Sequence, residues 1–292
     1  MTPPKQSMSS WSSRERVAAA IAHRTSDRLP LTFDAQPEVY ARMYAHFGLS
    51  PSDRAALFDR LGVDTWMVGP RHQGAPPEPD ERGERTSIWG YRTRRISYGG
   101  GAYDEFVHAP LAGRDEVADI RRHAWPSPAQ IDFSELPDRI AQGGERAVIG
   151  AFTWGPFFIA SVVRGMEDLL VDFAVRPTYA HALIERIGEI SEAALDTLLE
   201  RHGARLDIVY MADDYCSHQA PLFSPAMFRT FVMPYLRRYV EKVHRRGQKF
   251  LLHCCGAVRP LLPMIIEAGV DVLEPIQITA AGMEPAALKR DF

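Results

Sequence analysis

KFLLHCCGAVRPLLPMIIEAGVDVLEPIQ, residues 249–277, holds the strand–helix–strand pattern that decides the fold. Two apolar runs, 249–255 and 270–277, have the length of buried strands, and the segment between them, 261–269, reads as a helix. Strands that are apolar on both faces and are joined through a helix are typical of a parallel sheet buried beneath helices.

The same alternation extends along most of the chain. Four further apolar runs predict strands at 29–33, 64–69, 147–152 and 207–214. The predicted helices cover 15–23, 38–47, a stretch starting near Ser52 or Asp53, two helices over 157–202 separated by Pro177, 225–247 and the last residues from 286. Ser224 is the expected N-cap of the helix over 225–247, and Pro234 is expected to kink it.

Two segments depart from this pattern. Residues 1–12 are rich in Ser, Pro, Lys and Gln, which predicts a disordered segment, and residues 13–292 are expected to form a single domain. Within it, residues 70–146 are rich in Arg, Gly and Pro, and we interpret them as an excursion with a hairpin at about 86–98 and a short helix near 134–141.

Doubly wound sheets and (β/α)8 barrels share the strand–helix alternation. No Gly-rich nucleotide fingerprint follows a predicted strand, which favours the TIM-type (β/α)8 barrel. A closed barrel has eight strands, whereas the sequence offers six candidates. We therefore expect a barrel truncated after about six strands, with the C-terminal βα units, on the order of 60 residues, missing.

Composition excludes several classes of protein. The net charge of −3 gives no basic surface for nucleic acid, and no window is apolar enough for a membrane span. The N-terminus lacks the apolar core of a signal peptide, and three cysteines with no disulfide-like spacing favour a reducing compartment. These features predict a cytoplasmic protein that acts on a small molecule.

The ends of the later strands carry the chemistry. His253 and Cys255 are two residues apart on one strand, so both side chains face the barrel interior, while Cys254 faces the helices. Imidazole and thiolate together suit zinc. On spacing alone, a buried strand that contains soft residues is favoured over a metal site, because buried Cys is usually a small hydrophobe. A redox site is less favoured still, because adjacent cysteines bridge only with strain.

Other strand ends add candidates with alternatives of their own. Asp213 and Asp214 are predicted catalytic residues that hold a cation, orient a water or ligate a metal, or else cap the following segment. Glu274 is a candidate metal ligand or base, or else a surface cap. The residues expected to bind substrate are Asp34, Tyr215 and Gln277. Cys216 lies in a predicted loop and is expected to be incidental.

Several motifs together resemble the uroporphyrinogen decarboxylase superfamily, in particular its zinc-containing, corrinoid-dependent methyltransferase branch. The motifs are SP-x-x-F-x-x-F-x-x-PY (224–235), H-x-CG (253–256) and EAGVDVL-x-P-x-Q (267–277). RGMEDLL…RP (164–177) and ERVAAAIAHRTSDRLPL (15–31) extend the resemblance over nearly the whole chain.

The resemblance implies a (β/α)8 barrel in which zinc is held by a His-x-Cys pair and by a second Cys much later in the chain. His253 and Cys255 are then two ligands, a third would lie beyond Phe292, and Glu274 stands where a displaceable fourth ligand can reach. The implied reaction moves a methyl group between a corrinoid (methylcobalamin) protein and a thiol or folate-like acceptor, with zinc lowering the pKa of the thiol.

Two alternatives remain. The first is uroporphyrinogen decarboxylation in porphyrin biosynthesis, a lyase reaction without a cofactor. Against it, FDAQPEVYARM (33–43) lacks the arginine pair of true decarboxylases, and WMVGPRHQG (66–74) lacks their acidic residue. The second is an inactive, C-terminally truncated fragment that keeps the fold signature.

Overall fold

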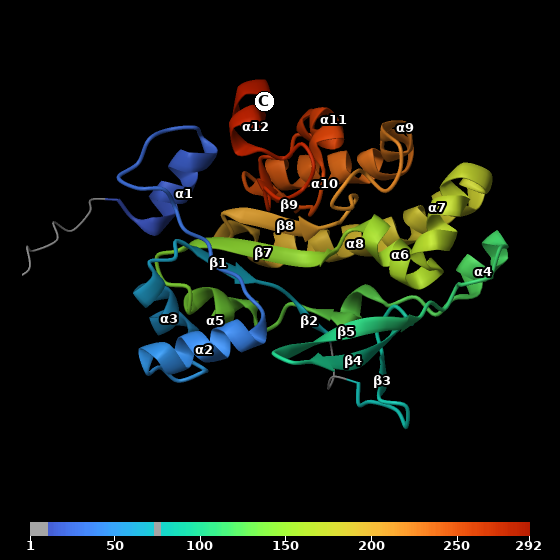
Figure 1. Cartoon of the computed structure of the whole chain (residues 1–292), viewed down its shortest axis with the longest axis horizontal. Helices are drawn as coiled ribbons and strands as arrows, with labels where there is room; N and C mark the ends of the chain where they lie inside the picture. The colour runs from blue at the N-terminus through green and yellow to red at the C-terminus, as the bar shows by residue number, and fades with distance from the viewer. Residues whose placement is uncertain (1–10, 73–76) are drawn as a thin grey trace, which may run out of the picture.

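A five-stranded parallel sheet organises the molecule. The computed structural model describes residues 11–72 and 77–292 (Figure 1). The sheet has the order β1-β7-β8-β9-β10, and every neighbouring pair of strands is parallel. Its strands are β1 (Thr65–Val68), β7 (Ala147–Trp154), β8 (Ile208–Ala212), β9 (Lys249–His253) and β10 (Val272–Glu274). The α/β class is confirmed, and the described strands form an open, TIM-like sheet rather than a closed barrel.

The prediction of a strand at 29–33 is wrong. Leu29 is 83% exposed, and the segment contacts the start of β1 mainly through Asp64. The Leu31 N–H donates to Asp64 Oδ2 at 2.8 Å, and the Leu31 carbonyl accepts the Asp64 N–H at 2.7 Å. Pro30 has no N–H to offer a ladder. A carboxylate therefore fixes this segment where a strand was expected, and β1 is left as an edge strand.

Helices connect and cover the strands (Figure 1). Their bounds are α1 (Ser13–Ile21), α2 (Pro37–Phe47), α3 (Arg54–Leu61), α4 (Val117–Arg122), α5 (Leu136–Ala141), α6 (Pro156–Arg164), α7 (Met166–Val175), α8 (Pro177–His202), α9 (Pro225–Met227), α10 (Met233–Arg245), α11 (Leu262–Glu267) and α12 (Pro285–Asp291). None of the described helices is long and apolar enough to cross a membrane.

The two faces of the sheet have different surroundings. Trp66, Val148, Val209 and Phe250 belong to the large core beneath the helices, to which α8 and α10 contribute. The opposite face carries a smaller cluster near the strand starts, where Val17 of α1 packs on the sheet. We call this opposite face the inner face. Near the ends of the strands it is open to polar groups.

Local sequence signals explain several helix ends. The Ser12 hydroxyl accepts the Glu15 N–H and so caps the start of α1. Ser12 belongs to the segment 1–12 that was predicted to be disordered. Residues 1–10 of that segment lie outside the described residues. Ser224 caps α9 as predicted. Three helices rather than two cover 156–202, because Gly165, with φ of 97°, breaks the first predicted helix.

The helix in which a kink is predicted at Pro234 contains a π-helix over Phe228–Val232, directly before α10. Pro234 has no N–H to bond to the carbonyl of the preceding turn. The π-helix is a short departure from the α-helical pattern in the turn before this proline.

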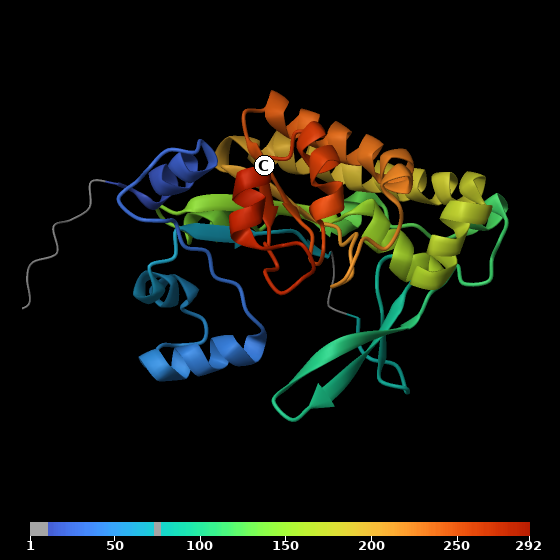
Figure 2. The same cartoon turned by 45° about the horizontal axis from the view of Figure 1, so that its top comes forward.

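The excursion over 70–146 contains more strand than predicted. It holds β2 (Arg71–His72), β3 (Glu84–Thr86), β4 (Arg92–Tyr98), β5 (Gly101–His108) and β6 (Ile131–Asp132). β4 and β5 pair as a long hairpin that projects from the body (Figure 2). Its turn is at Gly99–Gly100, so the predicted hairpin at 86–98 ended too early. The short helix predicted near 134–141 is confirmed as α5.

Arg164 ties this excursion to the helices. The side chain is fully buried, and it donates to the Leu111 carbonyl at 2.6 Å, to Asp115 at 2.7 Å and to Asp172 at 2.8 Å. Asp172 is also fully buried and accepts a second guanidinium, that of Arg176, at 2.6 Å. Removing one partner of such a buried pair leaves an uncompensated charge.

We expect Arg164→Ala to lower the free energy of unfolding by about 3–5 kcal/mol, the usual cost of breaking a buried ion pair. Chemical denaturation followed by circular dichroism measures this change. Arg186→Ala, which removes an exposed helical pair with Glu189, is the control and should leave stability nearly unchanged. Equal stability of the two variants would contradict a structural role for Arg164.

Candidate metal centre

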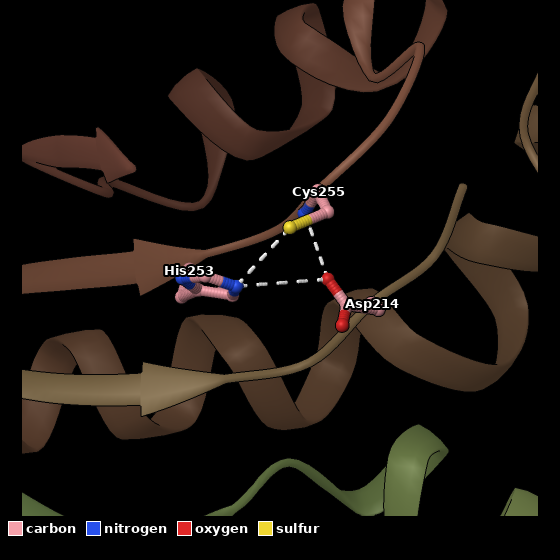
Figure 3. Close-up of side chains that lie close together, drawn as sticks. All are labelled: Asp214, His253 and Cys255. Atoms are coloured by element: carbon pink, nitrogen blue, oxygen red, sulfur yellow. Dashed lines mark hydrogen bonds and ion pairs between the residues drawn. The ribbon is translucent and has the colours of Figure 1, made fainter. Parts of the chain in front are cut away.

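The register between β8 and β9 brings the predicted site residues together. Ala212 lies opposite His253 in the parallel ladder. Asp214 follows Ala212 by two residues and Cys255 follows His253 by two, so the alternation of side chains directs all three toward the inner face. Figure 3 shows Asp214, His253 and Cys255 pointing toward one another from the two strand ends. We call these three residues the donor cluster.

The donor cluster has the dimensions of a metal site. His253 Nε2 lies 3.3 Å from Cys255 Sγ and 4.0 Å from Asp214 Oδ1. One nitrogen, one sulfur and one carboxylate oxygen lie within 4.8 Å of one another, close enough to share one ion. The Cys255 N–H also donates to Asp214 Oδ1 at 2.7 Å, which fixes the carboxylate beside the thiol.

Glu274 supports the cluster from the next strand. It lies opposite His253 in the β9–β10 ladder, and its Oε2 is 2.6 Å from His253 Nδ1. A carboxylate on Nδ1 orients the ring and leaves Nε2 directed at the ligand position. Glu274 thus contacts the imidazole, and Asp214 supplies the carboxylate of the donor cluster.

The electrostatics favour a cation at this place. Burial, with the nearby charges of Asp214 and Glu274, raises the pKa of Cys255 to about 11. The hydrogen bond that His253 donates to Glu274, with the charges of Glu274, Asp214 and Asp34, raises the pKa of His253 despite its burial. Both shifts include a contribution from the negative charge of Asp214 and Glu274. A divalent cation would compensate it, and the mixed N, S and O donors fit zinc.

Asp213 has a separate structural environment. It is almost fully buried, and its carboxylate accepts the N–H groups of Phe158 at 2.6 Å and Phe157 at 3.3 Å at the start of α6. Burial raises the pKa of Asp213 to about 7. Gly155 permits this approach, since a Cβ there would lie 2.2 Å from Asp213 Cγ. Asp213 therefore caps a helix from earlier in the chain.

The other predicted residues surround the cluster at different depths. The Gln277 side chain accepts the Gly256 N–H at 2.7 Å and so holds the loop after Cys255. Gly256 is needed there, with φ of 93° and the Ser217 carbonyl 2.4 Å from where a Cβ would lie. Tyr215 is fully buried in aromatic contacts with Phe157, Phe223 and Phe228. Asp34 lines a cavity on the inner face.

The two remaining cysteines face away from the cluster. Cys254 is fully buried in the large core, as strand alternation predicts, and its sulfur accepts the Tyr215 N–H at 3.4 Å. Contact with Cys216 and burial raise the pKa of the Cys254 thiol. Cys216 thus packs on this core cysteine, a contact that its predicted place in a loop did not indicate.

Tyr210 is a site residue that the sequence reasoning missed. It lies on β8 on the same face as Ala212, with its ring centroid 6.1 Å from that of His253. Burial, followed by the charges of Glu274, Asp34 and Asp214, raises the pKa of the Tyr210 hydroxyl. The two-residue spacing from Tyr210 through Ala212 to Asp214 was the available signal.

Comparisons with known proteins bear on the family and the fold of this chain. The uroporphyrinogen decarboxylase (URO-D) family model matches residues 118–278, which include β8, β9, β10 and the donor cluster. No curated sequence is similar enough to match. Among solved structures, a methyltransferase from Methanosarcina mazei matches with a TM-score of 0.60 at 16% sequence identity, over 90% of this chain and 75% of that one.

The likeness to the methyltransferase concerns the fold, since so low an identity carries nothing finer. The family match spans more than half of the 292 residues. The chain therefore belongs to the uroporphyrinogen decarboxylase (URO-D) family of enzymes.

Proposed function

We propose that this chain is a zinc-dependent methyltransferase that moves a methyl group between a corrinoid protein and a thiol or folate-like acceptor. The observation that carries the proposal is the convergence of His253, Cys255 and Asp214 at the ends of β8 and β9. These residues are the proposed zinc ligands. A nitrogen, sulfur and oxygen set with a position left for substrate is characteristic of catalytic rather than structural zinc.

The chain's own residues would prepare that position. Glu274 accepts the Nδ1 proton of His253 and so selects the tautomer whose Nε2 is a donor to metal. Asp214 accepts the Cys255 N–H and holds the end of β9 in place. Bound zinc would lower the pKa of a substrate thiol so that it reacts as a thiolate near neutral pH.

Glu274 and Asp213 keep further proposed roles. For Glu274 to serve as a displaceable fourth ligand or as a base, its hydrogen bond to His253 would have to open. Asp213 can hold or release a proton near neutral pH, but its carboxylate is committed to the start of α6. We therefore assign Asp213 a supporting part and place the chemistry at the donor cluster.

Family and fold support the proposal from outside the site. The matched structure from Methanosarcina mazei is a methyltransferase, and active sites of TIM-like folds lie at the C-terminal ends of the strands. The parallel order of the five strands also favours a (β/α)8 barrel as the complete architecture. Three free cysteines favour the reducing cytoplasm as the place where the enzyme acts.

Purified protein should contain close to one zinc per chain, measured by inductively coupled plasma mass spectrometry. His253→Ala and Cys255→Ser should remove the metal, because each deletes a proposed ligand. Glu274→Gln should weaken zinc binding by about 10–100-fold, the usual effect of losing a carboxylate that orients a ligating histidine.

His244→Ala is the matched control for these variants. His244 also pairs with a carboxylate, Asp271, at 2.6 Å, but at the opposite end of the strands, beside Lys249. This variant should keep its zinc. Metal loss from His244→Ala to the same extent as from His253→Ala would refute the assignment of the donor cluster.

A second prediction concerns the reaction. With 2-mercaptoethanol as acceptor, the zinc-loaded protein should consume methylcobalamin and form the methyl thioether, followed by absorbance and mass spectrometry. His253→Ala should abolish the reaction, and His244→Ala should retain it. If neither 2-mercaptoethanol nor tetrahydrofolate is methylated, while a metal-free preparation decarboxylates uroporphyrinogen, the proposed function is wrong and the decarboxylase alternative stands.

A further inference from the structure

A large cavity lies between α2, α3 and the edge of the sheet. Its volume is about 850 Å³, within the range of small-molecule sites. The walls are mainly apolar and aromatic, with Phe33, Tyr40 and Tyr44 on one side and Met67 and Ile149 on the other. A small number of charged groups also line it: Asp34, Arg54 and Arg139.

The two arginines give the cavity an unbalanced positive charge. The guanidinium of Arg54 stacks over Phe58 and Trp66, with its Cζ at 4.7 and 4.4 Å from the ring centroids. The carbonyls of Met67 and Gly69 each accept one N–H, from Arg54 at 3.2 Å and from Arg139 at 2.5 Å. Among the described residues, no carboxylate lies within 4.0 Å of either guanidinium.

The surroundings of Arg139 strengthen the case for an anion. Burial lowers the pKa of Arg139, and the positive charges of Arg71 and Arg54 lower it further, against the opposing charge of Glu135. Arg54 and Arg139 each use one N–H to bind a carbonyl at the end of β1. A guanidinium has five N–H donors, so most donors of both arginines can bind a ligand. Two guanidinium groups in a partly apolar cavity are costly unless an anion pairs with them.

The cavity and the donor cluster share the inner face of the sheet. Ala151, which lines the cavity, lies opposite Tyr210 in the β7–β8 ladder. Tyr210 is on the same face as Ala212, which lies opposite His253. Asp34, at the cavity wall, is close enough to raise the pKa of both Tyr210 and His253. A ligand in the cavity would therefore lie along the face that leads to the donor cluster.

We propose that this cavity binds a small carboxylate with a flat or apolar body, whose anionic group pairs with Arg54 and Arg139. The apolar body would lie on Met67, Ile149 and Ala151, and its far end would point along the inner face toward Asp34 and the donor cluster. That this carboxylate is the methyl donor or acceptor rests on the proposed function, whereas its binding does not. Arg54 belongs to α3 and Arg139 to α5. Neither lies in segment 33–43, where true decarboxylases would carry their arginine pair.

Titration calorimetry on the full chain tests the proposal with naphthalene-2-carboxylate and its neutral analogue naphthalene-2-carboxamide. The two probes share shape and apolar area and differ in charge. The carboxylate should bind at least about 10-fold more tightly, as expected for charge-assisted hydrogen bonds. Arg139→Gln should remove this preference and leave the affinity for the amide unchanged.

Arg71→Gln is the matched control, since it removes one positive charge nearby from an exposed residue that does not line the cavity. It should bind both probes as the wild type does. Arg54→Lys keeps the charge and the fold while losing the planar fork, and should bind the carboxylate less tightly than the wild type does. Equal affinity for the two probes, wild-type preference in Arg139→Gln, or no binding of either probe would overturn the proposal.

The outcome is separable from that of the proposed function. If the protein binds zinc and transfers methyl groups but does not prefer the carboxylate, the carboxylate site is wrong and the proposed function stands. If the protein binds no metal and transfers no methyl group but still prefers the carboxylate, the carboxylate site stands and the methyl-transfer assignment is wrong.

Discussion

The parallel register that sets Ala212 beside His253 is the constraint on which the candidate site depends. With the register fixed, side-chain alternation alone directs Asp214 and Cys255 to the same face as His253. A shift of one residue would turn the imidazole into the large core and bring Cys254 to the inner face. The neighbouring register, Glu274 beside His253, adds the carboxylate that holds Nδ1. Two ladders thus set the positions of His253 and Glu274 and direct Asp214 and Cys255, which directly follow β8 and β9, to the same face.

Helix α6 links this site to the rest of the molecule. Asp213 accepts backbone N–H groups at its start, and Arg164 at its end binds the segment around Leu111 in the excursion. One short helix therefore connects the strand end before Asp214 with the region that carries the hairpin β4–β5. Both connections use a buried charged group with several hydrogen bonds, which makes each of them costly to break.

Sequence periodicity predicted five of the strands, most of the helices and the helix caps, because each depends on residues close in the chain. The prediction failed at 29–33, where Asp64, more than thirty residues away, replaces strand pairing. It also missed the length of the hairpin, which depends on pairing between β4 and β5. The His253 and Cys255 pair was predictable from spacing on one strand. Asp214 was a candidate because it follows a predicted strand, but its position beside His253 and Cys255 depends on contacts between strands and was not predicted. Tyr210 was missed for the same reason.

The inner face of the sheet therefore carries both the donor cluster and a cavity with two arginines, and the central claim concerns the donor cluster. X-ray absorption spectroscopy of the zinc-loaded protein tests it most directly. The account predicts one sulfur ligand at about 2.3 Å together with nitrogen and oxygen ligands at about 2.0–2.2 Å, including the multiple-scattering signature of imidazole. A zinc shell with no sulfur, or with two or more sulfur ligands, would contradict the assignment of His253, Cys255 and Asp214 as the ligands.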